Sequence, residues 1–167
     1  LVDNNGKLFK RIRIDSGKAG IDATVEDYSF LIWGIIELYQ LTYDPNYLEL
    51  ASLYSDFMVE HYLDKNDGSF YFTPDYGEDL LVRSKDVYDG AIPSGNSVSA
   101  YNFIRLSKIL NNEKYQQIAN QTIDAFSSRI NRSGSGYTMM LQAIDYDFGP
   151  SHEVIIVGDY KNPKTQA

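Results

Sequence analysis

Residues 25–42 read VEDYSFLIWGIIELYQLT, a run of helical length that is apolar on nearly every side. A helix with this pattern is buried on most of its faces. Thr24 stands at the expected N-cap position, and Asp27 follows three residues later, close to a capping-box arrangement. Residues 43–46, YDPN, have turn chemistry, and Pro45 suits the start of another helix. The sequence therefore predicts a buried inner helix followed by a tight turn.

The next segment, residues 46–63, has the pattern of an amphipathic helix. Its apolar residues recur at intervals of three and four and so share one stripe: Tyr47, Leu50, Ala51, Tyr54, Phe57, Met58 and Tyr62. Glu49 and Glu60 fall outside that stripe. An inner helix followed by an amphipathic outer helix indicates an α-hairpin.

The chain also contains an internal repeat, because a shift of 68 residues aligns Leu38 with Leu106 and Tyr47 with Tyr115. The aligned segments and the one after them predict a second inner helix, a second outer helix and the start of a third inner helix, over residues 94–110, 114–130 and 137–148. Stacked α-hairpins form either open solenoids or closed α/α toroids.

Residues 64–93 break the helical pattern. Residues 69–73 and 80–83 are short strand-like runs, and residues 74–77 between them have turn chemistry. This arrangement predicts a small β-hairpin inserted after the first helix pair. A further strand is predicted over residues 153–158, EVIIVG.

Composition limits the function classes. The chain has 167 residues with 23 acidic and 15 basic side chains, a formal net charge of −8 that argues against nucleic-acid binding. No apolar run is long enough to cross a membrane. The absence of cysteine excludes thiolate chemistry, and two histidines argue against a histidine-rich metal site, so we expect neither a metal nor a cofactor. The 14 tyrosines suit helix interfaces or a sugar-binding pocket.

Four stretches resemble one known family: residues 26–32 (EDYSFLI), 67–72 (DGSFYF), 85–97 (KDVYDGAIPSGNS) and 153–158 (EVIIVG). Together they are similar to the C-terminal part of the spermatogenesis-associated protein 20 family. The resemblance implies a thioredoxin-like domain joined to a six-hairpin α/α toroid related to glycosidases and N-acylglucosamine 2-epimerases. It implies that residues 1–167 form a single domain that is a fragment of the toroid, partnered in the parent chain by the other toroid half and the thioredoxin-like domain. Leu1 in place of an initiator Met agrees with a fragment.

The expected fold class is therefore mainly α, a partial α/α toroid of the six-hairpin glycosidase type with an inserted small β-hairpin and a C-terminal strand. The repeat places Glu26, Asp27 and Tyr28 opposite Ser94, Gly95 and Asn96, at equivalent inner-helix starts. In a toroid these ends face one mouth.

Glycoside chemistry needs two carboxyl groups roughly 5–10 Å apart, and neighbouring helices about 8–10 Å apart can supply them. We expect Asp27 and Asp89 to act as the catalytic acid and base. The expected substrate-binding residues are Glu26, Tyr28, Asp86, Tyr88, Ser94 and Asn96. Under the alternative interpretation Asp27 and Ser94 cap helices and Asp89 holds a turn.

The leading hypothesis is a cytoplasmic domain that binds or processes carbohydrate, in the manner of a glycosidase or a sugar epimerase. Epimerase chemistry by paired histidines lacks support, because no histidine falls on an inner helix. The alternative is a non-catalytic helical scaffold that docks a protein or domain. The apolar character of residues 25–42 also predicts self-association of the chain as a homodimer, which light scattering can test.

Overall fold

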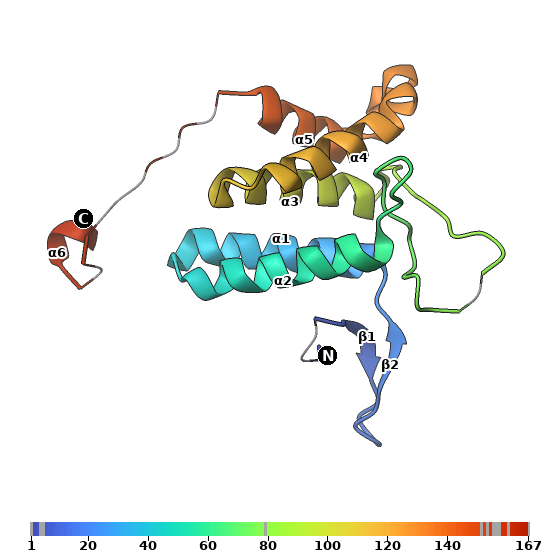
Figure 1. Cartoon of the computed structure of the whole chain (residues 1–167), viewed down its shortest axis with the longest axis horizontal. Coiled ribbons are helices and arrows are strands. Elements are labelled where there is room, and N and C mark those ends of the chain that lie inside the picture. The colour runs from blue at the N-terminus through green and yellow to red at the C-terminus, as the bar shows by residue number, and fades with distance from the viewer. Residues whose placement is uncertain are drawn as a thin grey trace.

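The computed structural model describes residues 2–3, 6–78, 80–150, 152, 154, 158–159 and 161–166. Two strands precede the helices (Figure 1), and the elements are β1 (Phe9–Ile12), β2 (Ala19–Asp22), α1 (Val25–Thr42), α2 (Pro45–Tyr62), α3 (Gly95–Leu110), α4 (Glu113–Arg132), a short 3₁₀ turn (Gly134–Gly136), α5 (Thr138–Phe148) and α6 (Pro163–Gln166). In this part of the chain no helix is long and apolar enough to span a bilayer.

The predicted repeat is confirmed by the two helix pairs, α1–α2 and α3–α4. The inner helix of each pair ends in a residue with left-handed backbone, Tyr43 at φ 54° and Asn111 at φ 50°. The next residue, Asp44 or Asn112, caps the outer helix by accepting a backbone N–H with its side chain. Each pair of equivalent turn residues is 68 positions apart, so the same local chemistry builds both α-hairpins.

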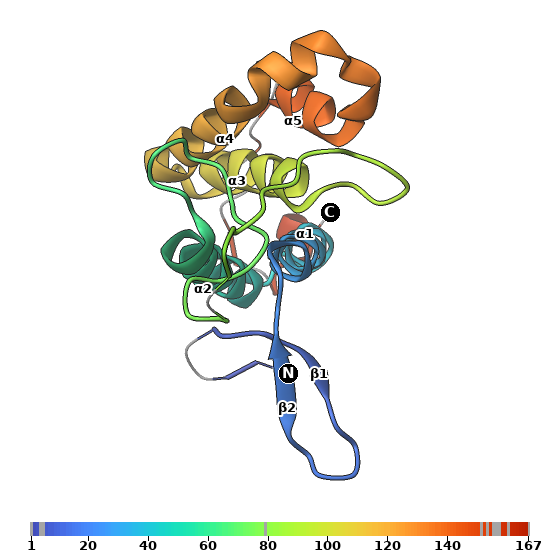
Figure 2. The same ribbon diagram turned by 90° about the vertical axis from the view of Figure 1, so that its right-hand side faces the viewer.

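The helices form two layers. In the inner layer α3 packs between α1 and α5, and in the outer layer α2 covers α1 while α4 covers α3 (Figure 2). Arg105 on α3 is buried and donates to Glu37 on α1 at 2.7 Å and to Gln40 at 2.9 Å. Arg105 and Glu37 are equivalent positions in the repeat, so the two inner helices meet at repeat-equivalent sites.

Aromatic side chains fill much of the core. Phe70, from the segment after α2, stacks on Phe103 of α3 with ring centroids 5.7 Å apart. Tyr28 of α1 stacks on Phe57 and meets Tyr62 edge-on. Offset stacks and edge-on contacts add to the hydrophobic gain of burial.

The predicted β-hairpin over residues 69–83 is wrong. Phe70 forms only an isolated bridge with Leu63, and its backbone N–H and C=O bond instead to the side-chain amide of Asn96. The segments still approach each other, because the Phe72 N–H donates to the carbonyl of Ser84 at 2.8 Å. The strand expected over residues 153–158 falls mostly on residues outside those described.

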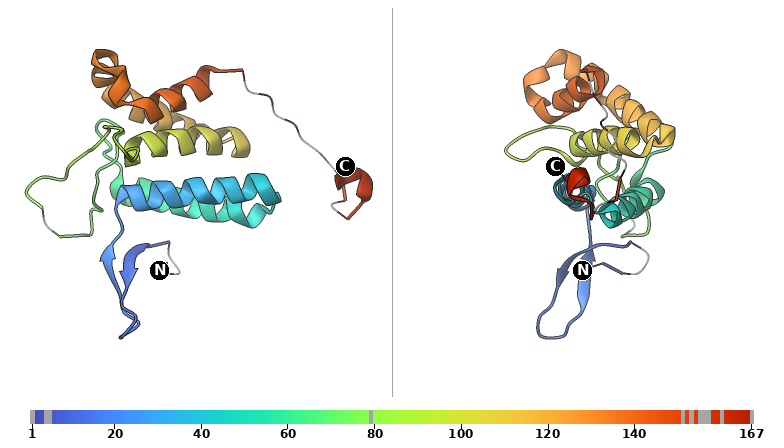
Figure 3. Two further views of the ribbon diagram at one scale, coloured as in Figure 1. Left: turned by 180° about the vertical axis from the view of Figure 1, so that it is seen from behind. Right: turned by 90° about the vertical axis from the view of Figure 1, so that its left-hand side faces the viewer.

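In the described residues the two-stranded sheet lies before α1 instead. Strand β1 pairs antiparallel with β2, with Arg11 opposite Gly20 and Ile12 opposite Ala19. The hairpin stands on the side of α1 and α2 that is away from α3 and α5 (Figure 3). Its base is held by the Tyr28 hydroxyl, which accepts from the Leu8 N–H at 2.7 Å.

The exposed side chains on α1 include Leu38 and Leu41. These residues lie on the helix for which the sequence predicted self-association. That homodimer stays a prediction.

The close approach of α1 and α3 generates a stability prediction. Gly95 opens α3, and a Cβ added there would lie 2.7 Å from Val25 Cγ1 and 3.1 Å from the Glu26 nitrogen. We expect Gly95→Ala to force the helix starts apart and to lower the free energy of unfolding by about 1–3 kcal/mol, measured by urea denaturation. The control is Gly34→Ala, since Gly34 is exposed in α1 with open space around it, and a gain of up to about 1 kcal/mol is expected. Equal stability of Gly95→Ala and the native chain would contradict this packing.

Candidate functional site

The polar residues available for a ligand lie where α1 and α3 begin, beside the segment that precedes α3 (Figure 1). Gly95 brings the first turn of α3 against Val25 and Glu26. The carbonyl of Asp86 accepts from the Asn96 side chain at 2.7 Å, which holds the preceding segment at the same end. We call the partly or fully exposed residues of this region the polar mouth: Glu26, Asp27, Asp86 and Tyr88.

The pKa of Glu26, in the polar mouth, is perturbed. Partial burial raises the pKa of Glu26 above its ordinary 4.5, and the negative charges of Asp86 and then Asp27 raise it further, while Lys10 opposes the shift. Desolvation and like charge both favour the neutral carboxyl. Glu26 therefore retains its proton to a higher pH than an ordinary glutamate.

Asp86 lies near enough to Glu26 for their charges to interact. Its side chain is exposed, and Oδ1 accepts from the Tyr88 N–H at 3.0 Å. The Tyr88 ring, 62% exposed, follows directly. The polar mouth thus combines a carboxyl that favours protonation, an exposed second carboxylate and an accessible aromatic ring.

Asp27 has the geometry of the capping alternative. Its Oδ2 accepts from the Thr24 N–H at 2.7 Å and from the Thr24 hydroxyl at 2.8 Å. Lys10 lies 3.6 Å from the same oxygen. Asp27 is close to the expected site but is held against the start of its own helix.

Asp89 also has a structural geometry. It is buried, and Oδ1 accepts from the Ser94 N–H at 2.9 Å. Oδ2 accepts from the N–H groups of Met139 at 2.9 Å and Met140 at 3.1 Å. Both oxygens of the expected catalytic carboxylate therefore bond to the starts of α3 and α5, so the geometry favours the turn-holding alternative.

Three expected substrate-binding residues lie in the interior, which corrects their expected place at the mouth. Tyr28 has no exposed surface, and its hydroxyl bonds to Leu8 and Gly6. Ser94 caps α3 by accepting from the Ser97 N–H at 3.2 Å. Asn96 is 1% exposed and has its amide bonded to Phe70 and Asp86. None of these side chains is open to a ligand.

Lys10 also contributes to this region, which was not predicted from the sequence. This residue lies on β1, which was not predicted, and reaches the start of α1 from the hairpin. A nearby basic side chain, Lys85, is instead used structurally, because it lies 2.6 Å from Asp64 and 2.8 Å from Asp67. Among the described residues no group of three or more histidine and acidic side chains could hold a metal ion.

The three hydrogen bonds to Asp89 make it a stability determinant. Bonds to a charged group contribute more than neutral ones, and asparagine removes the charge and one acceptor. We expect Asp89→Asn to lower the free energy of unfolding by about 1–3 kcal/mol in urea denaturation. Asp124→Asn, at an exposed position on α4, should change it by less than about 0.5 kcal/mol. If the two variants are equally stable, Asp89 does not tie the helices together.

The raised pKa of Glu26 can be measured by NMR titration of its side-chain carboxyl. Asp86→Asn removes one repulsive charge and should move the pKa of Glu26 down toward 4.5, whereas Lys10→Ser should move it up. Between 4.5 and the raised pKa the folded chain binds more protons than the unfolded chain, so stability falls as pH rises through that window. Glu26→Gln should remove the contribution of Glu26 to that slope. If the pKa of Glu26 is the same in Asp86→Asn as in the native chain, the charge of Asp86 does not act on Glu26.

No family model matches the chain. It is 31% identical to rat spermatogenesis-associated protein 20, over 98% of this chain and 23% of the relative. The human protein of the same name is 30% identical over 86% of this chain and 18% of its own length. An uncharacterised protein of Caenorhabditis elegans is 29% identical over 96% of this chain. The chain thus spans about a fifth of the length of the curated relatives it matches.

Two solved structures share the fold. A GH76 α-mannanase of Bacteroides thetaiotaomicron superposes with a TM-score of 0.60 at 19% identity, over 72% of this chain and 34% of the enzyme. A UGL variant described with the saccharide dGlcA-Glc-Rha-Glc has a TM-score of 0.52 at 15% identity, over 98% of this chain and 47% of its own. The chain therefore belongs to the spermatogenesis-associated protein 20 family and has the α/α-toroid fold of glycosidase-like enzymes.

Proposed function

We propose that this chain contributes a carbohydrate-binding surface, the polar mouth, to an α/α toroid. The observation that carries the proposal is the juxtaposition of Glu26, whose pKa is raised, with the exposed carboxylate of Asp86. The fold supports it, since one of the superposed structures is an α-mannanase and the other is named together with a saccharide. The chain spans 23% of the rat relative, so carbohydrate as the substrate of the whole protein is likewise a proposal.

The proposed roles follow from the surroundings of the two carboxyl groups. Hydrolysis of a glycosidic bond needs an acid that protonates the leaving oxygen and a carboxylate that activates water or attacks the sugar. Glu26 suits the acid, because burial and like charge keep it protonated to a higher pH. Asp86 suits the base, and the exposed Tyr88 ring offers a face for stacking on a sugar. This pair replaces the expected pair of Asp27 and Asp89, whose oxygens bond to helix starts.

A second candidate is the docking scaffold, which one specific observation favours. Leu80, Leu81 and Val82 are consecutive apolar residues with 47%, 105% and 79% of their surface exposed. They lie in the segment between α2 and α3, and Leu80 lines a groove together with Thr24, the N-cap of α1, so a protein or domain docked there would lie beside the start of α1. Exposed apolar patches of this kind mark interaction surfaces.

Titration with oligosaccharides separates the two candidates. We expect mannan oligosaccharides or oligosaccharides with a uronic acid to shift backbone NMR signals of residues 26 and 86–88. Glu26→Gln and Asp86→Asn should each weaken binding by about tenfold, roughly 1.4 kcal/mol. If the toroid hydrolyses the sugar, each variant should also lower the rate by about 10²–10⁴, as expected for a lost acid or base.

The matched control is Glu49→Gln on the exposed face of α2, which should bind like the native chain. Absence of any shift at millimolar saccharide, or an equal loss in Glu49→Gln, would reject the carbohydrate proposal and leave the scaffold.

A further inference from the structure

Charge is distributed unevenly along this acidic chain. Residues 7–18 hold five of the 15 basic side chains and a single acid, Asp15. Their formal charge is therefore +4, while the rest of the chain has 10 basic and 22 acidic residues and a charge of −12. The basic segment forms β1 and the tip of the β1–β2 hairpin, which points away from the helices (Figure 2).

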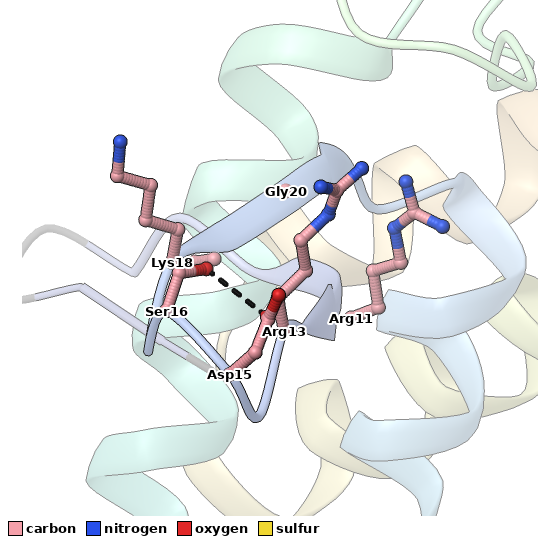
Figure 4. A pocket seen from close by; sticks show the side chains of 7 residues that line it. Arg11, Arg13, Asp15, Ser16, Lys18 and Gly20 are labelled. Atoms are coloured by element: carbon pink, nitrogen blue, oxygen red, sulfur yellow. Dashed lines mark hydrogen bonds between the residues drawn. The ribbon is translucent and has the colours of Figure 1, made fainter.

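The two arginines of this segment lie on one face of the hairpin. Arg11 and Arg13 are two residues apart, which puts their side chains on the same side of the strand at a spacing of about 7 Å. Figure 4 shows both side chains extending in the same direction, with Lys18 on the other side of the tip. Gly20 stands opposite Arg11 and has no side chain, and open space surrounds it. The face therefore has room for a ligand beside Arg11.

These cations lack the partners that others in the chain have. Lys7 lies 2.8 Å from Asp22, and Lys10 lies 3.6 Å from Asp27. In the part of the chain that the structure describes, no carboxylate lies within 4.0 Å of Arg11, Arg13 or Lys18. The hairpin tip thus concentrates unpaired positive charge on a chain that has an excess of acids.

A shallow groove of about 410 Å³ follows this face, lined by residues that include Arg11, Arg13, Asp15, Ser16, Lys18 and Gly20 (Figure 4). The carboxylate of Asp15 accepts a 3.4 Å hydrogen bond from the Ser16 hydroxyl and forms no ion pair with either arginine. Three cations and one carboxylate leave the groove with a net charge of +2.

We propose that the Arg11–Arg13 face is an oxyanion-binding site, which takes a phosphate or a clustered carboxylate carried by a ligand or partner. The planar guanidinium group binds both oxyanions with two parallel hydrogen bonds, and two guanidinium groups whose side chains leave the same side of a strand can contact one doubly charged group together. Lys18 adds a third positive charge at the tip. The proposal is independent of the carbohydrate function, because it uses the hairpin tip and none of the polar-mouth residues.

The test is an NMR titration of the arginine Nε–H signals with pyrophosphate and, separately, with citrate. We expect saturable shifts of the Arg11 and Arg13 signals, and the tighter of the two probes identifies phosphoryl or carboxylate as the preferred group. Arg11→Ser/Arg13→Ser should weaken binding by about tenfold or more, because two charge-assisted forks are lost.

The matched control is Lys65→Ser/Arg132→Ser, which removes the same charge from exposed positions outside the hairpin. It should bind like the native chain, and circular dichroism should show all variants folded. The absence of saturable shifts with either probe would overturn the proposal even if the double variant failed to fold. An equal loss in the control would also overturn it, because the effect would then be one of net charge alone.

Discussion

The carboxylate of Asp89 determines where two of the three inner helices begin. A charge this deeply buried is costly unless it is paired, and here backbone N–H groups of Ser94, Met139 and Met140 satisfy it. The starts of helices carry partial positive charge, so one carboxylate stabilises both α3 and α5. The Asp89 N–H also donates to the carbonyl of Gly136, which fixes the turn before α5. This interaction holds the starts of α3 and α5 next to each other. It thereby also positions the segment before α3 that carries Asp86 and Tyr88.

The helical part of the fold could be predicted because its information is local and repeated. The turn residues Asp44 and Asn112 and the apolar stripes recur 68 positions apart, and the structure forms both turns from them. The misplaced β-hairpin had a non-local cause: the amide of Asn96, 26 residues away, takes the backbone bonds of Phe70 that a partner strand would have taken. The real hairpin was missed because β1 is largely exposed and its apolar residues, Phe9 and Ile12, are separated by two adjacent basic residues, so it lacks the apolar alternation of a packed strand. The turn residue Gly17, at φ 64°, was its one strong local signal.

The sequence was enough to locate the candidate site but not to tell which of its residues face a ligand. Acidic residues at helix starts serve both as caps and as catalytic groups. Glu26 and Asp27 are neighbours in the first turn, yet Asp27 bonds back to Thr24 while Glu26 stays at the surface with a raised pKa. Helical geometry explains the difference, since the third position of a helix faces its own N-cap and the second does not. Tyr28 and Asn96 have the chemistry of sugar-binding residues, but the fold buries both. Only the three-dimensional arrangement shows which polar groups are left available.

The pleat of β1 separates the two electrostatic features of this chain. Lys10 and Arg11 are adjacent, but successive side chains of a strand point to opposite faces. Lys10 therefore faces the start of α1, where it lies 3.6 Å from Asp27 and opposes the rise in the pKa of Glu26. Arg11 and Arg13 lie on the other face with no carboxylate within 4.0 Å among the residues described. An anion bound by Arg11 and Arg13 would therefore affect the polar mouth only through its electrostatic field, which solvent and salt screen. Each of the two surfaces can thus be altered without changing the other.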